Sequence, residues 1–363
     1  VSGIIDFGDT VRSYTVGELA VLLATVMAHN RAAPLAAAAR VVGRFHAAFP
    51  LTEAELAVLF PLVGLRVCAT TTSAAQQAAL EPGNEYVQEF AAAEWPTLDL
   101  VAGLAPTLAH AMFRQACGLE PHPRHQAIRG WLRANAGQIS PLLNADLAGR
   151  GVTVLDLGVG SDDLADGVWE RPGAVRAHIA RALKERGEGL GLGRHAEARL
   201  SYTRYDSPVE PETIHLGVEL FVPAETAVFA PLDGAVARLG WNELIVRHEP
   251  AAGCAFYTRY AGLAPADLLA VGARVQRGEV LGRVAAADVG APLPPHLHYQ
   301  LACDLPGDLP ALAAGSERAV WLSICPDPNL ILNFPNLQPA QDWPPTDTLL
   351  ARRAGDTYTF DIH

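Results

Sequence analysis

The sequence predicts a multidomain α + β protein in which an all-helical block precedes a small antiparallel β domain. Three observations support this fold class. Leucine and alanine recur at helical spacing over about residues 15–143, as in Leu19, Leu22, Leu23 and Val26. Beyond residue 199 the pattern changes to short alternating segments between glycine and proline turns. A glycine-flanked stretch of mixed pattern separates the two parts.

Breaks in this pattern set the expected domain limits. A glycine pair at Gly149 and Gly151 ends the helical pattern, and the mixed stretch that follows predicts a strand at 152–157 and a helix at 172–187. Prolines and asparagines dominate the end of the chain, which is typical of a linker. The expected parts are a helical lobe (1–148), a connecting α/β segment (149–208), the β domain (209–335) and a linker or tail (336–363).

The individual elements follow from the apolar spacing. Thr52 and Glu55 have the spacing of a capping box, so we expect a helix to begin after Thr52. About six helices are expected, from near residue 15 and then at 34–48, 53–80, 84–92, 98–117 and 123–143. Expected strands are 214–222, 227–229, 234–239, 244–248, 255–260, 280–284 and 296–302.

Composition restricts the partners. The formal net charge is −12 and the basic residues form no run, so we expect no nucleic-acid and no membrane partner, since both need a concentrated positive surface. Charges or prolines interrupt each apolar run, so none is expected to span a membrane. Five cysteines without a CxxC pair predict reduced thiols and a cytoplasmic location. A peptide or small-molecule substrate is expected, and the sequence carries no signal of oligomeric state.

The alternation of residues 214–222 suggests half of a metal site. His215 and Glu219 share one face of this segment. In a straight strand they would lie roughly 13 Å apart, at about 3.3 Å per residue. A zinc ion needs each ligand at about 2 Å. The backbone is therefore expected to bend between them, at Gly217.

The other half lies in a strand that follows two prolines. His296, His298 and Gln300 point to one side of this strand, and apolar residues point to the other. Two histidines on one face can both bind one ion, or one can bind it while its neighbour handles protons. Together with the upstream histidine and glutamate they predict a metal-derived site.

Four motifs in this order resemble the LytM/lysostaphin family of zinc endopeptidases. They are His215-Leu-Gly-Val-Glu219, Ala230-Pro-Leu-Asp-Gly234, Gly272-x-x-Val275-x-x-Gly278 and His296-Leu-His298. The resemblance covers about residues 209–305. It implies a small antiparallel β-barrel or sandwich that cleaves peptide cross-bridges of bacterial cell walls. It also implies His215, Glu219 and His298 as zinc ligands, and His296 as the catalytic residue that polarises water or steadies the transition state.

Two departures from that family predict a degenerate active site. Glu219 stands where the family has aspartate. Gly262, in Tyr260-Ala-Gly-Leu263, stands where the family has a transition-state histidine. Loss of one such donor costs on the order of 10²–10³ in rate. Glu219→Asp with Gly262→His should restore hydrolysis, provided that Gly262 does not have a positive φ. The alternative is a non-catalytic metal-binding or spacer module.

The N-terminal segment carries a second resemblance. Gly3-Ile-Ile-Asp6-Phe-Gly-Asp9 before a helical block resembles aminoglycoside-phosphotransferase-like small-molecule kinases, over residues 1 to about 145. By this match Asp6 binds the magnesium ions that bridge nucleotide phosphates. Only the helical lobe is represented, so Mg²⁺ and ATP are expected only together with a nucleotide lobe upstream of Val1. This chain alone is expected not to transfer phosphate.

The order of the parts resembles a fused protein family. In that family such a kinase and such a peptidase domain precede a class III, pyridoxal-phosphate-dependent aminotransferase, and the stretch 325–332 resembles the join. The aminotransferase needs a Schiff-base lysine. Lys184 is the only lysine and lies before the join. The chain is therefore expected to be a fragment of a larger kinase/aminotransferase fusion protein, without the aminotransferase.

Overall fold

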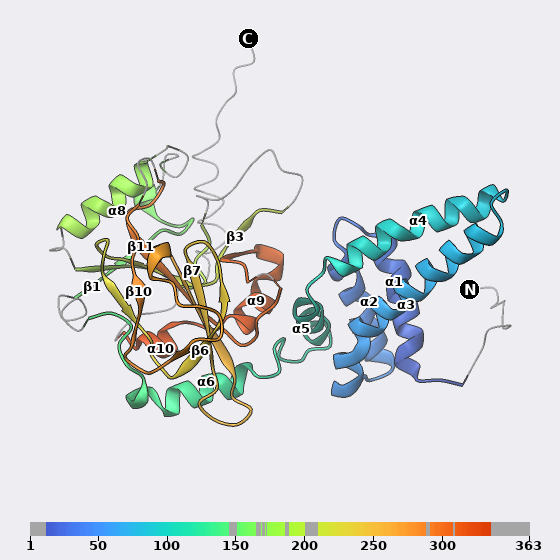
Figure 1. Ribbon diagram of the computed structural model, residues 1–363, viewed down its shortest axis with the longest axis horizontal. Helices are drawn as coiled ribbons and strands as arrows, with labels where there is room; N and C mark the ends of the chain where they lie inside the picture. The colour runs from blue at the N-terminus through green and yellow to red at the C-terminus, as the bar shows by residue number, and fades with distance from the viewer. Residues whose placement is uncertain are drawn as a thin grey trace, which may run out of the picture. The chain divides into compact units, whose positions relative to one another are not determined.

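The computed structural model describes residues 12–144, 151–164, 168, 171, 173–185, 189–199, 210–287, 291–307 and 309–334. The chain divides into two compact units, residues 1–122 and 123–363. In Figure 1 the first unit is helical and the second contains the strands. The coarse prediction of a helical region followed by a β-rich region is confirmed.

The helical unit buries one apolar cluster, to which Leu19, Leu23 and Leu59 belong. The predicted capping box is present: Glu55 N donates to Thr52 Oγ1 at 3.3 Å, and Thr52 N donates to the Glu55 carboxylate at 2.8 Å. Both bonds satisfy backbone donors that the first turn of a helix leaves open. The helices are α1 (Thr15–His29), α2 (Pro34–Ala48), α3 (Glu53–Leu80), α4 (Glu85–Ala102) and α5 (Pro106–Ala116).

Helix limits differ from the prediction in one region of this unit. Two apolar stripes at 84–92 and 98–117 were expected to be separate helices, but α4 continues through Pro96 to Ala102. Pro106 then occupies the first turn of α5, where its missing N–H costs no helical hydrogen bond. The helix break therefore lies directly before Pro106 and not at Pro96.

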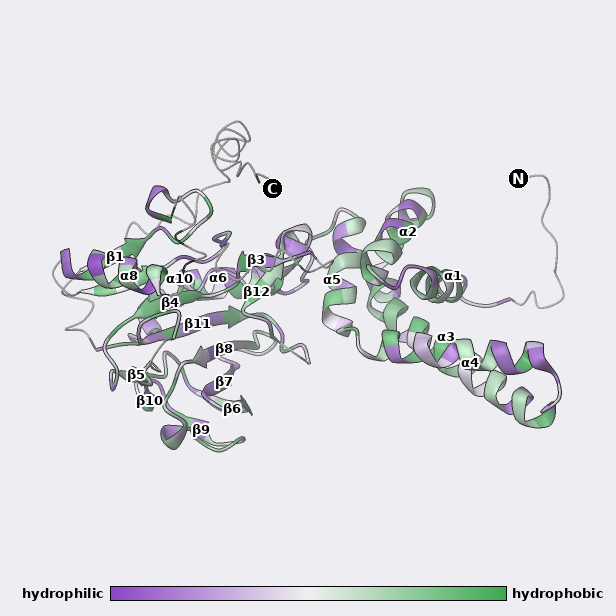
Figure 2. Ribbon diagram, turned by 90° about the horizontal axis from the view of Figure 1, so that it is seen from above, coloured by the Kyte–Doolittle hydropathy of each residue, from purple (hydrophilic) through white to green (hydrophobic). Residues whose placement is uncertain are grey.

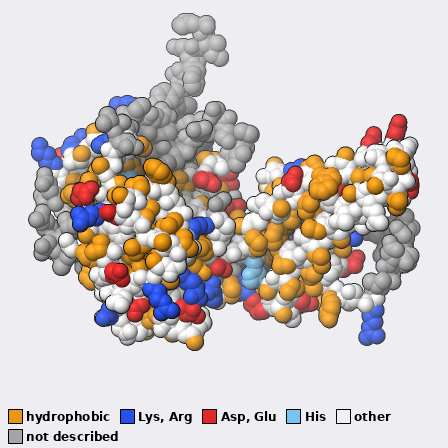
Figure 3. All heavy atoms as spheres, in the orientation of Figure 1, with side chains coloured by type: hydrophobic (Ala, Val, Ile, Leu, Met, Phe, Trp, Pro, Cys, Tyr) orange, Lys and Arg blue, Asp and Glu red, His pale blue; other side chains and the backbone are white. Residues whose placement is uncertain are grey.

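Helix α3 corrects the expectation about membrane spans. By length and composition alone this helix is long and apolar enough to cross a membrane, although Pro61 lies inside it. Leu59 and Val63 on one side of α3 pack in the helical core. Val58 and Leu65 are exposed, and Figure 3 shows hydrophobic side chains over α3 and α4. Helix α3 is therefore long and apolar enough for a membrane span, while one of its faces packs in a protein core.

The second unit is organised around one eight-stranded sheet with the order β1-β2-β4-β11-β8-β7-β6-β9. Two two-stranded sheets, β10·β5 and β12·β3, complete the described strands. Figure 2 shows β4, β11 and β8 in succession. The strands are β1 (Val152–Leu155), β2 (Leu190–Gly193), β3 (Glu212–His215), β4 (Val218–Phe221), β5 (Ala227–Phe229), β6 (Gly234–Leu239), β7 (Glu243–His248), β8 (Phe256–Ala261), β9 (Arg274–Val275), β10 (Val280–Arg283), β11 (His296–Ala302) and β12 (Leu312–Ala314).

The expectation of a purely antiparallel barrel or sandwich is corrected at one edge. β1 and β2 pair in parallel, so the sheet is mixed. The order of the described strands ends at β1 and β9. The reason lies in the connecting segment 149–208, which supplies β1 and β2 with helix α8 (Ala174–Glu185) between them. A parallel pair needs such a crossover connection. β2 then pairs with β4 and extends the sheet.

The limit between the compact units lies earlier than the expected domain limit at residue 148. Ile128 and Leu132 of α6 pack in the apolar core of the β-rich unit. The amphipathic pattern of this segment predicts an apolar face without telling which core it joins. The other helices of this unit are α6 (His125–Ala134), α9 (Arg318–Ile324), α10 (Asn329–Leu332) and the short 3₁₀ turns η1 (Ala136–Gln138), η2 (Asp162–Leu164), η4 (Pro265–Asp267) and η5 (Gly315–Glu317).

Both faces of β4 are covered. Val218 and Leu220 belong to the main core of the unit. Phe221, on the opposite face, packs in a second cluster with Val175 and Ile179 of α8. The connecting segment therefore covers the face of β4 that carries Glu219.

Candidate metal centre

The expected bend at Gly217 is confirmed. β3 ends at His215 and pairs with β12, whereas β4 begins at Val218 and pairs with β11 and β2. The chain therefore changes sheets within two residues. A Cβ on Gly217 would lie 2.7 Å from Tyr299 O and 2.8 Å from His298 Nε2. Glycine is required here because β11 and its histidine approach the backbone closely.

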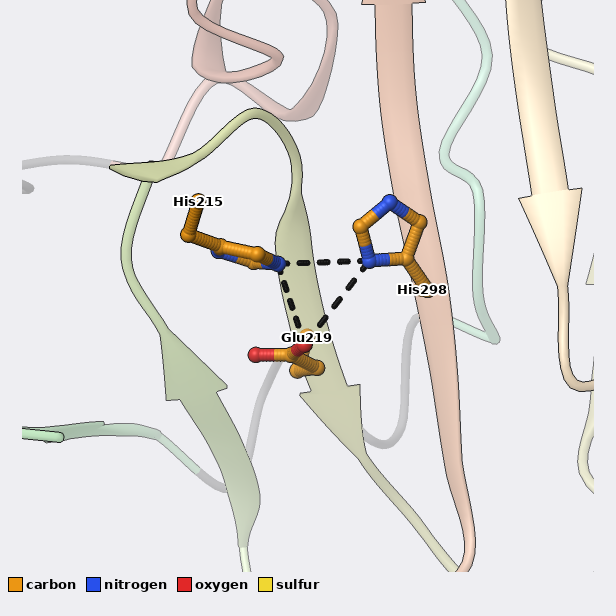
Figure 4. Close-up of side chains that lie close together, drawn as sticks. All are labelled: His215, Glu219 and His298. Atoms are coloured by element: carbon orange, nitrogen blue, oxygen red, sulfur yellow. Dashed lines mark hydrogen bonds and ion pairs between the residues drawn. The ribbon is translucent and has the colours of Figure 1, made fainter. Parts of the chain in front are cut away.

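Three donor atoms converge at this bend, as Figure 4 shows. His215 Nε2 lies 3.0 Å from Glu219 Oε1 and 3.2 Å from His298 Nδ1, and His298 Nδ1 lies 3.7 Å from the same Oε1. Glu219 and His298 are directly paired across β4 and β11. Ligands of a tetrahedral zinc ion at about 2.0–2.1 Å are separated by about 3.3–3.4 Å. Two of the three distances between the donor atoms are slightly shorter than this separation, and one is longer.

Each histidine has one ring nitrogen that faces away from the site, and the hydrogen bond of this outer nitrogen determines where the ring proton lies. His215 Nδ1 lies 2.9 Å from Arg194 O, and His298 Nε2 lies 3.3 Å from Gln300 Oε1. Both oxygens can only accept, so we assign the protons to these outer nitrogens. His215 Nε2 and His298 Nδ1 then present lone pairs to the Glu219 carboxylate. A cation between these three electron-rich atoms would offset the repulsion among their lone pairs, so the residues present fit a metal ion.

Gln300 has a role that the sequence did not assign. Its Oε1 accepts from Arg259 Nη1 at 3.3 Å, and its Nε2 donates to Pro310 O at 3.0 Å. A guanidinium can only donate, so the side-chain amide cannot be reversed. Arg259 is itself held by Glu243, 2.7 Å from its Nε. This chain of contacts keeps His298 Nδ1 unprotonated toward the site.

Burial and charge give the site the protonation states that metal ligands need. His215, Glu219 and His298 are 1%, 3% and 7% exposed. Burial, with a contribution from Arg199, lowers the pKa of His215 to about 4, so its ring is neutral near neutral pH. Burial alone would raise the pKa of Glu219, but the positive charge of Arg199 holds it well below its usual value. A neutral imidazole and an ionised carboxylate are ready to bind metal.

Arg199 and Glu197 are parts of the site that sequence reasoning missed. Arg199 Nη1 donates to Glu219 Oε2, and its Nε donates to Glu197 Oε2 at 2.9 Å. Arg199 is 1% exposed and Glu197 is 2% exposed. They enter the site because the strand-like stretch before residue 200 runs beside β3, where Arg199 N donates to Thr213 O at 2.8 Å. Their spacing in the sequence gives no signal of this contact.

The structure places His296 beside the three donors but not among them. It lies on the same face of β11 as His298, half-buried, with its ring 5.5 Å from that of Phe221. Its Nδ1 lies 2.8 Å from Pro294 O, which can only accept. The proton therefore belongs on Nδ1, and Nε2 is left as the basic nitrogen. Asp6, the expected magnesium ligand, lies outside the described residues.

Gly262 cannot be replaced by the histidine that its position would carry in the resembling family. Its φ is +91°, and a Cβ there would lie 2.5 Å from His296 O. The condition under which Gly262→His was expected to restore hydrolysis is therefore not met. The backbone has adapted to a glycine, and β11 occupies the space that a side chain would need.

Residues 213–305 match Peptidase family M23. This stretch is an M23 peptidase domain. It includes the three converging donors, together with His296 and Gly262. M23 peptidases are zinc metalloproteases.

Curated relatives match both parts of the chain. The N-terminal region is similar to hydroxylysine kinase of Bos taurus, with 35% identity over 99 residues, which are 27% of this chain and 26% of the relative. An uncharacterized metalloprotease of Haemophilus influenzae is 30% identical over 143 residues, covering 35% of this chain and 28% of the relative. The chain thus spans only about a quarter of the length of the curated relatives that it matches.

Solved structures of peptidases are also similar to part of the chain. The catalytic domain of lysostaphin from Staphylococcus simulans has 22% identity and a TM-score of 0.25, covering 34% of this chain and 81% of that one. A zinc-containing peptidase from Vibrio cholerae has 22% identity and a TM-score of 0.23, covering 30% of this chain and 35% of that one.

Proposed function

We propose that the β-rich unit binds one zinc ion through His215, Glu219 and His298 and is a peptidase-like domain with weak hydrolytic activity. The observation that carries the proposal is the set of three distances between the donor atoms. They lie close to the distance that separates two ligand atoms of a tetrahedral zinc ion. Structural zinc sites have four protein ligands, whereas catalytic sites have three and keep one position open. The three donors found among the described residues favour the catalytic type.

The residues around the donors suggest how hydrolysis would proceed and why it would be slow. Bound zinc supplies Lewis-acid chemistry and makes water acidic enough to lose a proton near neutral pH. His296 Nε2 is the base that would take up this proton, because its Nδ1 is committed to Pro294 O. Gly262 supplies no side-chain donor to the developing negative charge. One missing donor of this kind costs on the order of 10²–10³ in rate.

The proposed substrate class is a glycine-rich or cell-wall-type peptide. This proposal comes from the family resemblance and from the M23 match over residues 213–305. It concerns the domain that contains the site.

A second candidate function is a non-catalytic metal-binding or spacer module. The burial of the three donors favours it, since each of these residues is at most 7% exposed. A peptide bond must reach the metal to be cleaved. The fixed glycine at position 262 favours the same alternative.

Hydrolysis of a fluorogenic glycine-rich peptide distinguishes the two candidates. Zinc-loaded wild type should cleave it slowly, and His296→Ala should lower the rate by about 10²-fold or more while the zinc content is unchanged. His298→Ala should lose both activity and zinc. Folded, zinc-loaded wild type without any cleavage would support the non-catalytic module. Equal rates in wild type and His296→Ala would contradict the role of His296.

For the helical unit the proposal is a small-molecule kinase lobe. The similarity to hydroxylysine kinase supports it, and Asp6 is its proposed magnesium ligand. ATP and Mg²⁺ would be needed only together with a nucleotide lobe. We further propose a cytoplasmic location and small-molecule or peptide substrates, in accordance with the acidic composition and the dispersed cysteines.

A further inference from the structure

A buried positive charge from the chain itself lies at the candidate metal centre. We propose that Arg199 is a positioning residue and an internal counter-ion: it neutralises Glu219 in the metal-free centre and competes with the metal for this carboxylate. This inference rests on zinc binding by the same three donors. It adds a residue, and a limit on metal affinity, that the peptidase match does not assign.

The two oxygens of Glu219 have different partners. Oε1 faces the two histidine nitrogens, at 3.0 and 3.7 Å. Oε2 accepts from Arg199 Nη1. The Glu219 side chain is 4% exposed, so both oxygens depend on these partners and not on bulk water. Arg199 therefore orients Glu219 so that a single oxygen points between the histidines.

Arg199 is held in this position from both sides. Its Nε donates to Glu197 Oε2, while Glu197 Oε1 accepts from Leu157 N at 3.1 Å and from Arg194 Nη2 at 3.1 Å. The order Arg194, Glu197, Arg199, Glu219 is a row of alternating charges. Such a row is paired throughout without any metal.

Strand β2 leaves room for this ion pair. Gly193 lies directly opposite Glu219 in the pairing of β2 with β4. A Cβ on Gly193 would lie 2.6 Å from Arg199 Nη2 and 2.9 Å from Glu219 Oε2. A side chain at this position would displace the guanidinium or the carboxylate. The backbone around the centre thus accommodates the arginine.

The arrangement has two consequences for metal binding. Glu219 is already neutralised before a metal arrives, so the centre attracts a divalent cation less than an unpaired carboxylate would. The guanidinium also remains near the ion and repels it. Arg199 should therefore weaken zinc binding and keep the metal-free fold stable. A residue that only supports the shape of the site would have the opposite effect, because its removal would weaken zinc binding.

The test compares zinc affinity across matched variants, by competition with a chromophoric chelator. In Glu197→Gln/Arg199→Met one negative and one positive charge are removed together, so Glu197 is not left as an unpaired buried charge. Arg199→Gln keeps a donor toward Glu219 without the charge. Both should bind zinc at least tenfold more tightly than wild type. Arg199→Lys, which keeps the charge, and Glu197→Gln alone should show no such gain.

A second readout is thermal unfolding with chelator and with excess zinc. The charge-removing variants should lose stability in chelator and show a larger zinc-induced rise in Tm than wild type. Equal or weaker zinc binding by the folded variants, with zinc bound by wild type, would overturn the role of Arg199 alone. Absence of zinc binding in wild type and in every folded variant would overturn the metal site and this inference with it.

Discussion

The close approach at Gly217 gives the sharpest mutational prediction. In Gly217→Ala the new methyl group would lie 2.7 Å from Tyr299 O and 2.8 Å from both Cε1 and Nε2 of the His298 ring. Real Cβ contacts are not that short, so β11 or the imidazole must move. Gln300 holds Nε2 of this ring, and a displacement of about 0.5 Å is enough to disturb a metal geometry.

The expected loss can be estimated from two terms. Overpacking of a well-packed site costs about 1–3 kcal/mol of unfolding free energy. Disturbing the support of a metal ligand costs about 10–100-fold in metal affinity. Urea denaturation and competitive zinc titration measure these terms separately. Gly307→Ala is the matched control, because a Cβ on this exposed glycine meets no atom within 4 Å. A folded Gly217→Ala with the stability and zinc affinity of the control would refute the reasoning.

Three further predictions concern other residues of the β-rich unit. Gly262→His should lower the unfolding free energy by about 2 kcal/mol or more, because of its φ of +91° and the contact with His296 O, and should not raise hydrolysis; a folded variant with faster cleavage would contradict this. Gln300→Leu should weaken zinc binding by about 10–100-fold in the same titration, since His298 loses the acceptor that fixes its proton; unchanged affinity would exclude that role. Burial lowers the pKa of His248 to about 4 from its ordinary 6.5, so its contribution to stability is full above pH 6.5 and is lost as the pH falls to 4. This loss is about 3 kcal/mol, and a flat stability profile over that range would contradict it.

Much of the β-rich unit could be predicted from local pattern. The strand 296–302 and the strand 227–229 were predicted with the limits that the structure has. The bend at Gly217 followed from comparing a strand's rise with a metal–ligand distance, and it required no knowledge of the surrounding fold. Local periodicity and covalent geometry are sufficient for such features.

Other parts of the site depend on contacts between distant segments. Arg199 lies 20 residues before Glu219, and it reaches the carboxylate because the stretch that follows β2, itself paired with β4, runs beside β3. The strand β2 is four residues long and contains two glycines, so its pattern gives almost no strand signal. The positive φ of Gly262 likewise depends on how closely β11 passes. Spacing in the sequence cannot report these contacts.

The measurement that tests the central claim most directly is the zinc content of the protein after equilibrium dialysis against zinc. Wild type should retain about one zinc per chain, and His298→Ala should retain almost none. His296→Ala is the control from the same face of the same strand, and it should keep its zinc. Equal zinc content in wild type and in folded His298→Ala would contradict the assignment of His215, Glu219 and His298 as the metal centre.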